Sequence, residues 1–246
     1  LVEHSSAARE IFEKADAILG RPLSKLCFEG PEEELKLTVN TQPALYVTSA
    51  AALAVLRAEG IEPGIVAGHS LGEYSALFAA GVFDFATGLR LVQARGQAMY
   101  EAGQARPGTM AALLNLESDQ VREICEKASA KGTVVPANWN SPGQIVVSGD
   151  PAAVEEAVRL AQEAGSRRSV MLPVSGAFHS PLVQPAVDVM RGELAKAELQ
   201  APRCKFVANV SAKLVDDVEA IREGLAAQIV SCVLWADSVE TIAREG

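Results

Sequence analysis

The feature that most restricts the fold is a tight turn encoded by Gly68-His69-Ser70-Leu71-Gly72. A short apolar segment precedes this turn, and a stretch with helical character follows it. A G-x-S-x-G motif between a strand and a helix is typical of a nucleophile elbow, in which the turn exposes the serine above a sheet. We therefore expect an α/β fold with Ser70 at a helix N-terminus, where the Leu71 N–H is placed to donate to an oxyanion.

Helical and strand-like segments alternate along the chain, as in α/β proteins. We expect helices at residues 3–19, 40–59, 73–80 and 84–102, and a short strand at residues 65–67. Asn40 and Pro43 support the second helix, as its cap and as a first-turn proline.

The middle of the chain has its own order of elements. It predicts a strand at 110–116, a helix at 118–130, strands at 133–139 and 144–148, a helix at 151–164 and a strand at 168–173. This β-α-β-β-α-β order is ferredoxin-like. Breakpoints rich in Gly and Pro or in small residues flank it, at 107–108 and 174–176. We expect residues 108–173 to form a small domain inserted into a larger α/β domain made of residues 1–107 and 174–246.

Composition excludes several classes of protein. Of the 246 residues, 49% are hydrophobic and 22% are charged, which is typical of a globular chain with a large core. The net charge of −9 repels phosphate backbones, and no apolar run approaches a membrane span, so we expect neither a nucleic-acid nor a membrane partner. Cys27, Cys125, Cys204 and Cys232 lie far apart without metal-ligand spacing, so we expect core thiols, no bound metal and a cytoplasmic location.

A serine hydroxyl needs a base to act as a nucleophile, and the chain has three histidines. His4 lies near an end, and His69 points away from its neighbour on a sharp turn, which favours a packing or supporting role. His179 follows the middle segment in a loop of small residues and is the candidate base. No acidic residue is close to it in sequence, so a distant carboxylate or a carbonyl group could orient its Nδ1.

Arg95 is the third candidate. It lies beside Val92 and Met99, on the inward edge of the apolar stripe of its predicted helix. An arginine there either reaches outward to solvent or is buried with an anionic partner. A substrate carboxylate would supply that partner through a bidentate pair.

Five segments now occur in a familiar order: Thr41-Gln42-Pro43-Ala44, Gly68-His69-Ser70-Leu71-Gly72-Glu73, Gln93-Ala94-Arg95-Gly96, Asn138-Trp139-Asn140-Ser141-Pro142-Gly143-Gln144 and Ala177-Phe178-His179-Ser180. Together they resemble the malonyl-CoA:acyl-carrier-protein transacylases, the acyltransferase family of fatty-acid and polyketide synthesis. The resemblance covers essentially the whole chain. It implies an α/β-hydrolase-like core with a parallel sheet and a ferredoxin-like insert. The family's first and last strands have no counterpart here, so we expect both ends to be truncated.

The resemblance also implies roles for single residues. Ser70 would be the nucleophile, His179 its base and Arg95 the ligand of the substrate's free carboxylate. Gln228 matches the residue whose neighbourhood orients the histidine, and Phe178 matches an aromatic residue that crowds out branched acyl groups. Asn138 and Asn140 match a pair near the site, for which a structural role is an equal alternative.

The implied activity is malonyl transfer through a malonyl-serine intermediate, with malonyl-CoA and acyl carrier protein as partners and no cofactor beyond the coenzyme A of the substrate. Because carrier proteins are acidic and this chain has a net charge of −9, a local basic patch is needed to contact one. Arg167 and Arg168 are candidates for that patch, and a solvated charge pair without such a role is the alternative. We expect a monomer.

Three other interpretations remain open at this point. The elbow also fits a serine esterase or a lipase-like hydrolase. The chain could instead be one acyltransferase segment of a multidomain synthase. A degenerate domain that only docks other proteins is the third.

Overall fold

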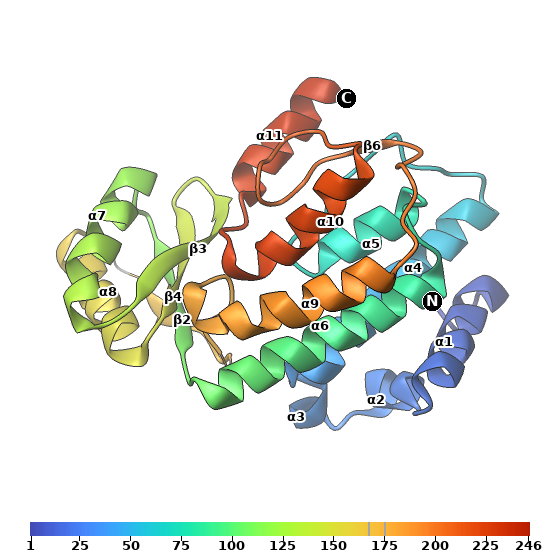
Figure 1. Ribbon diagram of the computed structural model, residues 1–246, viewed down its shortest axis with the longest axis horizontal. Coiled ribbons are helices and arrows are strands. Elements are labelled where there is room, and N and C mark those ends of the chain that lie inside the picture. Colours follow the sequence, from blue (N-terminus) through green and yellow to red (C-terminus); the bar gives the residue numbers. More distant parts are fainter. Residues whose placement is uncertain (167, 175) are drawn as a thin grey trace.

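The computed structural model describes residues 1–166, 168–174 and 176–246 and shows a mixed α/β protein (Figure 1). Its α-helices are α1 (Ser6–Leu19), α2 (Leu23–Glu29), α3 (Glu32–Leu35), α4 (Thr38–Ala58), α5 (Gly72–Ala79), α6 (Phe85–Ala105), α7 (Ser118–Ala128), α8 (Pro151–Glu163), α9 (Gln184–Lys196), α10 (Val218–Ala227) and α11 (Trp235–Glu245). Its strands are β1 (Ile65–Val66), β2 (Thr109–Leu114), β3 (Val134–Ser141), β4 (Gln144–Gly149), β5 (Val170–Met171) and β6 (Lys205–Phe206). Short 3-10 helices span Ser129–Lys131, Pro181–Val183 and Gln228–Val230.

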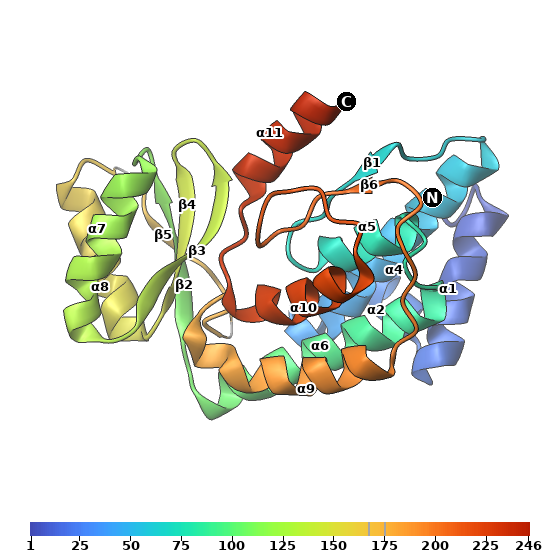
Figure 2. The ribbon, with the colours of Figure 1, turned by 45° about the horizontal axis from the view of Figure 1, so that its top comes forward.

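A small parallel sheet supports the elbow. β1 pairs with β6, with Ile65 opposite Lys205 and Val66 opposite Phe206. The predicted strand at 65–67 is therefore present, and the chain turns directly from it into α5 (Figure 2). Its partner β6 has only two residues, too few to show a periodicity in the sequence.

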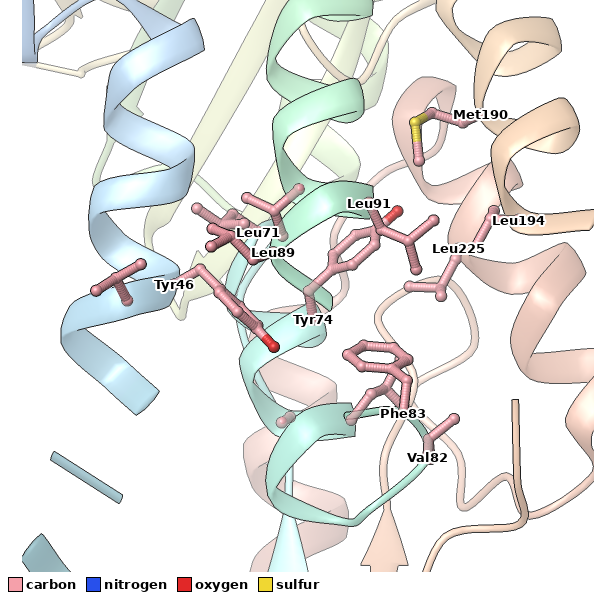
Figure 3. Close-up of a cluster of buried hydrophobic side chains, with 14 of the residues drawn as sticks. Tyr46, Leu71, Tyr74, Val82, Phe83, Leu89, Leu91, Met190, Leu194 and Leu225 are labelled. Atoms are coloured by element: carbon pink, nitrogen blue, oxygen red, sulfur yellow. The ribbon is translucent and has the colours of Figure 1, made fainter. Parts of the chain in front are cut away.

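The larger core lies among the long helices around this sheet. Figure 3 shows Tyr46 of α4, Tyr74 of α5, Leu89 of α6 and Leu225 of α10 in one buried cluster. α4 and α6 approach closely because Gly88 has no side chain: a Cβ there would lie 2.1 Å from the hydroxyl oxygen of Tyr46. This packing holds α6, the helix of Arg95, against the elbow.

A second, antiparallel sheet has the strand order β3-β4-β2-β5. α7 and α8 cover one of its faces, and the other face is turned toward the rest of the molecule (Figure 2). The predicted final strand at 168–173 is shorter than expected, because only Val170 and Met171 pair with β2.

Helix α4 starts earlier than the sequence predicted. It begins at Thr38, and Asn40 does not cap it, because the Asn40 side chain accepts a hydrogen bond from Arg21 at 2.7 Å. Pro43 consequently lies inside the helix and not in its first turn. The Val39 carbonyl, which lacks a Pro43 N–H as its partner, accepts from Arg21 Nη2 at 3.4 Å.

The cysteines are less buried than predicted. Cys125 is buried, whereas Cys27, Cys204 and Cys232 are partly exposed, and all four are free thiols. Within residues 1–166, 168–174 and 176–246, none of the helices combines the length and apolarity that crossing a bilayer requires.

Candidate active site

The elbow turn has a strained backbone that only particular neighbours permit. Ser70 has φ = 51°, in the left-handed region that non-glycine residues rarely adopt. The turn is so tight that a Cβ on Gly68 would lie 1.9 Å from the Gly72 carbonyl oxygen. Asn209 holds the turn from outside: its Oδ1 accepts from the Ser70 N–H, and its Nδ2 donates to the Gly68 carbonyl, both at 2.7 Å. The turn thus presents the Ser70 hydroxyl in one fixed direction.

His179 faces this hydroxyl. Its Nε2 lies 2.8 Å from Ser70 Oγ, and its Nδ1 lies 2.9 Å from the Gln228 carbonyl oxygen and 3.2 Å from that of Ser231. Carbonyl oxygens only accept, so Nδ1 carries the proton, and the Nε2 lone pair is directed at Ser70. The orienting group that the sequence left open is therefore a pair of backbone carbonyls.

The imidazole is kept neutral. His179 is 4% exposed, and burial, together with the nearby Arg95 cation, lowers its pKa to about 3. A neutral imidazole with a free Nε2 lone pair is the form that can accept the Ser70 proton.

Arg95 is buried, as one of the two alternatives for its helix face predicted, with 1% of its surface exposed. Its guanidinium donates to the Gln42 side-chain oxygen at 2.6 Å, to the Gln228 side-chain oxygen at 2.7 Å and to Ser70 Oγ at 3.1 Å. Its Nε has no partner among the described residues. A fixed cation therefore lies directly beside the candidate nucleophile.

Gln228 has a larger part in this site than the sequence suggested. Besides its carbonyl contact to His179, its side-chain Nε2 donates to the Ser70 carbonyl at 2.9 Å and to the Glu73 carboxylate. Three residues of this network, Glu73, Asn209 and Gln42, were not identified as site residues from the sequence. Glu73 had a usable signal, since it is a charged residue in the otherwise apolar start of α5, whereas Asn209 had none.

Leu71 lies immediately after the nucleophile and is buried. Within the described part of the chain its backbone N–H donates no hydrogen bond, so it is free for a ligand atom. This is the placement that an oxyanion donor after an elbow serine requires.

His69 points away from Ser70, toward β3. Its Nε2 lies 2.9 Å from Asn140 Oδ1, and its ring meets the Trp235 ring edge-on at 5.6 Å. Asn138 is buried and pairs with Val233 in a parallel bridge. These residues connect the elbow and the 228–235 segment to the antiparallel sheet.

The remaining candidates lie farther out. Phe178 packs against the apolar cluster of Met110, Ala137 and Val146 on the inward face of the antiparallel sheet. Arg168 is exposed, and Arg167 lies outside the described residues. In the described ranges no group of side chains has the composition of a metal site.

The geometry can be compared with known proteins. A family model described as "Acyl transferase domain" matches residues 1–246. A malonyl CoA-acyl carrier protein transacylase from Bacillus subtilis is 42% identical over 247 aligned residues, which cover 100% of this chain and 78% of that protein.

Solved structures agree with this. The crystal structure of acyl-carrier-protein-S-malonyltransferase from Bartonella henselae has a TM-score of 0.95 and 43% identity, covering 100% of this chain and 79% of that one. A type II PKS acyl-carrier protein in complex with its malonyl-transacylase gives a TM-score of 0.96 and 38% identity, with 100% and 80% covered.

Proposed function

The chain belongs to the acyl transferase domain family, and we propose that it transfers a malonyl group from malonyl-CoA to the phosphopantetheine thiol of acyl carrier protein, for fatty-acid synthesis. The observation that carries this proposal is that two side chains contact the Ser70 hydroxyl oxygen. Ser70 Oγ lies within hydrogen-bond distance of a neutral imidazole and of a buried guanidinium.

In the first half-reaction, Ser70 Oγ attacks the thioester carbonyl carbon of malonyl-CoA while its proton passes to His179 Nε2. The free Leu71 N–H stabilises the oxyanion of the tetrahedral intermediate. The intermediate then collapses, the carbon–sulfur bond breaks, and the departing coenzyme A sulfur takes the proton from His179. The product is a malonyl ester on Ser70.

In the second half-reaction, the phosphopantetheine thiol gives its proton to His179 and attacks the ester carbonyl. Collapse of this intermediate breaks the bond to Ser70 Oγ, which regains the proton from His179. The enzyme returns to its starting state, and the kinetics are ping-pong.

Arg95 selects the acyl group in this scheme. Its guanidinium is rigid, buried and adjacent to Ser70, so it can bind the free carboxylate of a malonyl group in a bidentate pair. Phe178 bounds the acyl site against branched groups. Gln228 orients the histidine, and His69, Asn138 and Asn140 support the elbow.

The finer architecture and context belong to the same proposal. Residues 1–107 and 174–246 would form an α/β-hydrolase-like domain, and residues 108–173 a ferredoxin-like insert. The enzyme would act as a cytoplasmic monomer without metal or redox cofactor, and without nucleic-acid or membrane partners. Arg167 and Arg168 would contact the carrier protein.

Mass spectrometry of the intact protein after mixing with malonyl-CoA tests the reaction class. We expect a stable malonyl adduct that is absent in Ser70→Ala and is discharged by adding carrier protein with its phosphopantetheine arm. Release of free malonate without an adduct would contradict transfer and indicate a serine hydrolase instead.

A further inference from the structure

A buried carboxylate beside the elbow has no role in the mechanism above. Glu73 lies in the first turn of α5 and is 3% exposed. An ionised side chain this deep in a protein needs compensating partners. The identity of those partners indicates what Glu73 does.

Glu73 is connected to Arg95 through one amide. The Asn209 backbone N–H donates to Glu73 Oε1 at 2.8 Å, and Gln228 Nε2 donates to Oε2. The other end of the same amide, Gln228 Oε1, accepts from Arg95 Nη2 at 2.7 Å. Because an ionised carboxylate only accepts, Glu73 fixes the orientation in which the Gln228 oxygen faces Arg95.

The charges around Arg95 show which group can neutralise the buried guanidinium. The direct hydrogen-bond partners of its guanidinium are neutral side chains, Gln42, Gln228 and Ser70. The titratable groups that face this cluster in the described chain are Tyr74 from α5, neutral His179 with His69 behind it, and Glu73. Glu73 is therefore the negative charge that balances the buried cation.

Opposing effects set the pKa of the Glu73 carboxyl group. Burial raises the pKa of Glu73 to about 7, against the bonds from Asn209 and Gln228 and the charge of Arg95, which lower it. A second carboxylate placed on Arg95 would bring two negative charges to one buried cation. Such a pair binds a proton more readily than either group alone.

We propose that Glu73 is a positioning residue that serves as the resident counter-charge of Arg95 and takes up a proton from solvent when a substrate carboxylate binds there. The inference rests on the proposed function. Once protonated, Glu73 is neutral, so the substrate carboxylate becomes the counter-charge of Arg95. The Gln228 amide keeps its bonds to the Ser70 carbonyl and to Arg95 Nη2.

Calorimetric titration of the unreactive Ser70→Ala protein tests this directly. Malonyl-CoA is titrated at about pH 8 in two buffers of different ionisation enthalpy, which gives the number of protons bound with the ligand. Acetyl-CoA is the reference, because it has the same phosphates and lacks the carboxylate. We expect the binding of malonyl-CoA to be accompanied by the uptake of more protons than the binding of acetyl-CoA, by up to one proton per site.

Two further variants identify the group. Adding Glu73→Gln should abolish the excess uptake, whereas Glu101→Gln, the same change at an exposed position on α6, should leave it unchanged. An excess that persists in Glu73→Gln, or equal uptake with both ligands, would overturn the inference while leaving malonyl binding intact. Failure of malonyl-CoA to bind would instead overturn the proposed function, and this inference with it.

A measurement that needs no change at Glu73 covers the case in which Glu73→Gln does not fold. Binding coupled to proton uptake tightens as the pH falls. The affinity of Ser70→Ala for malonyl-CoA relative to acetyl-CoA should therefore rise up to tenfold per pH unit between about pH 9 and 7, and then level off. A ratio independent of pH would overturn the inference.

Discussion

The Ser70 N–H donates a hydrogen bond to Oδ1 of Asn209, a residue 139 positions later in the chain, at 2.7 Å. Asn209 follows β6, so the partner strand of β1 also supplies the group that fixes the elbow. The direction of the nucleophile thus depends on a contact between the two strands' ends and not on the turn motif alone.

Replacing Asn209 with alanine should therefore loosen the elbow. The variant leaves the buried Gly68 carbonyl and the partly buried Ser70 N–H without their partners, which costs about 1–3 kcal/mol for a buried group and less for a partly buried one. We expect a lower free energy of unfolding in urea and at least a tenfold lower rate of malonyl-Ser70 formation. An unchanged rate would show that the turn holds its geometry unaided.

The two glycines of the elbow should respond differently to the same substitution. A Cβ on Gly68 would meet the Gly72 carbonyl at 1.9 Å, whereas a Cβ on Gly72 meets nothing within 4 Å. We expect Gly68→Ala to lose about 3 kcal/mol of stability together with its activity. Gly72→Ala should unfold at nearly the wild-type temperature, and equal melting temperatures for the two variants would contradict this account.

Removing the Arg95 cation should change which acyl group is accepted. We expect Arg95→Ala to lose about 2–5 kcal/mol in kcat/KM for malonyl-CoA, because the substrate carboxylate is left without its partner. The kcat/KM for acetyl-CoA should fall far less. Arg95→Met fills more of the space than Arg95→Ala, so it separates the loss of the charge from the effect of a cavity. A ratio of kcat/KM for malonyl-CoA to kcat/KM for acetyl-CoA equal to that of the wild type would exclude the carboxylate-binding role.

The rate of malonyl-Ser70 formation should not depend on pH on the acid side of neutrality. His179 acts as a base only when neutral, and it is neutral above its pKa, which burial and Arg95 lower to about 3. The rate of malonyl-Ser70 formation should therefore stay constant as the pH falls from about 7 to about 5, below the ordinary histidine pKa. Stopped-flow acylation measures it, and a tenfold fall over this range would show an unshielded imidazole.

Reversing the exposed charge of Arg168 should affect only the second substrate. We expect Arg168→Glu to raise KM for the acidic carrier protein several-fold, with KM for malonyl-CoA unchanged, because surface charges act mainly on encounter. Arg90→Glu provides a basic-to-acidic control at an exposed position on α6. Equal changes in both KM values would exclude a carrier-binding role for Arg168.

The sequence predicted the residues whose signals are local. Ser70 is marked by a motif and its flanking elements, and His179 by the small number of histidines. Helical periodicity left Arg95 open between an outward and a buried orientation, and the family resemblance assigned its role. The structure brings His179 and Arg95 within hydrogen-bond distance of Ser70 Oγ. The six helices predicted with both bounds lie within three residues of α1, α4, α5, α6, α7 and α8, because caps and apolar spacing are local too. The helices α2, α3, α9 and α10 were not predicted.

Contacts between distant segments could not be predicted in this way. Asn209 looks like any polar residue in a loop, and β6 has only two residues. The predicted start of α4 was wrong because the N–H groups of Asn40 and Thr41 already donate to the Leu37 carbonyl, so the helix begins before Asn40. Gln228 was identified by resemblance, but its side-chain bonds to Glu73 and Arg95 depend on where the 3-10 helix Gln228–Val230 lies relative to α5 and α6.

In the proposed mechanism, the two carbonyl oxygens at Nδ1 of His179 determine how strongly the protonated imidazole is stabilised. A carboxylate in their place would stabilise the imidazolium with a full negative charge, whereas the two carbonyl dipoles stabilise it less. The proton is therefore released readily to whichever sulfur or oxygen leaves. Such a loosely held proton suits an exchange between two thioesters of similar energy, which must run forward and backward over the same low barriers.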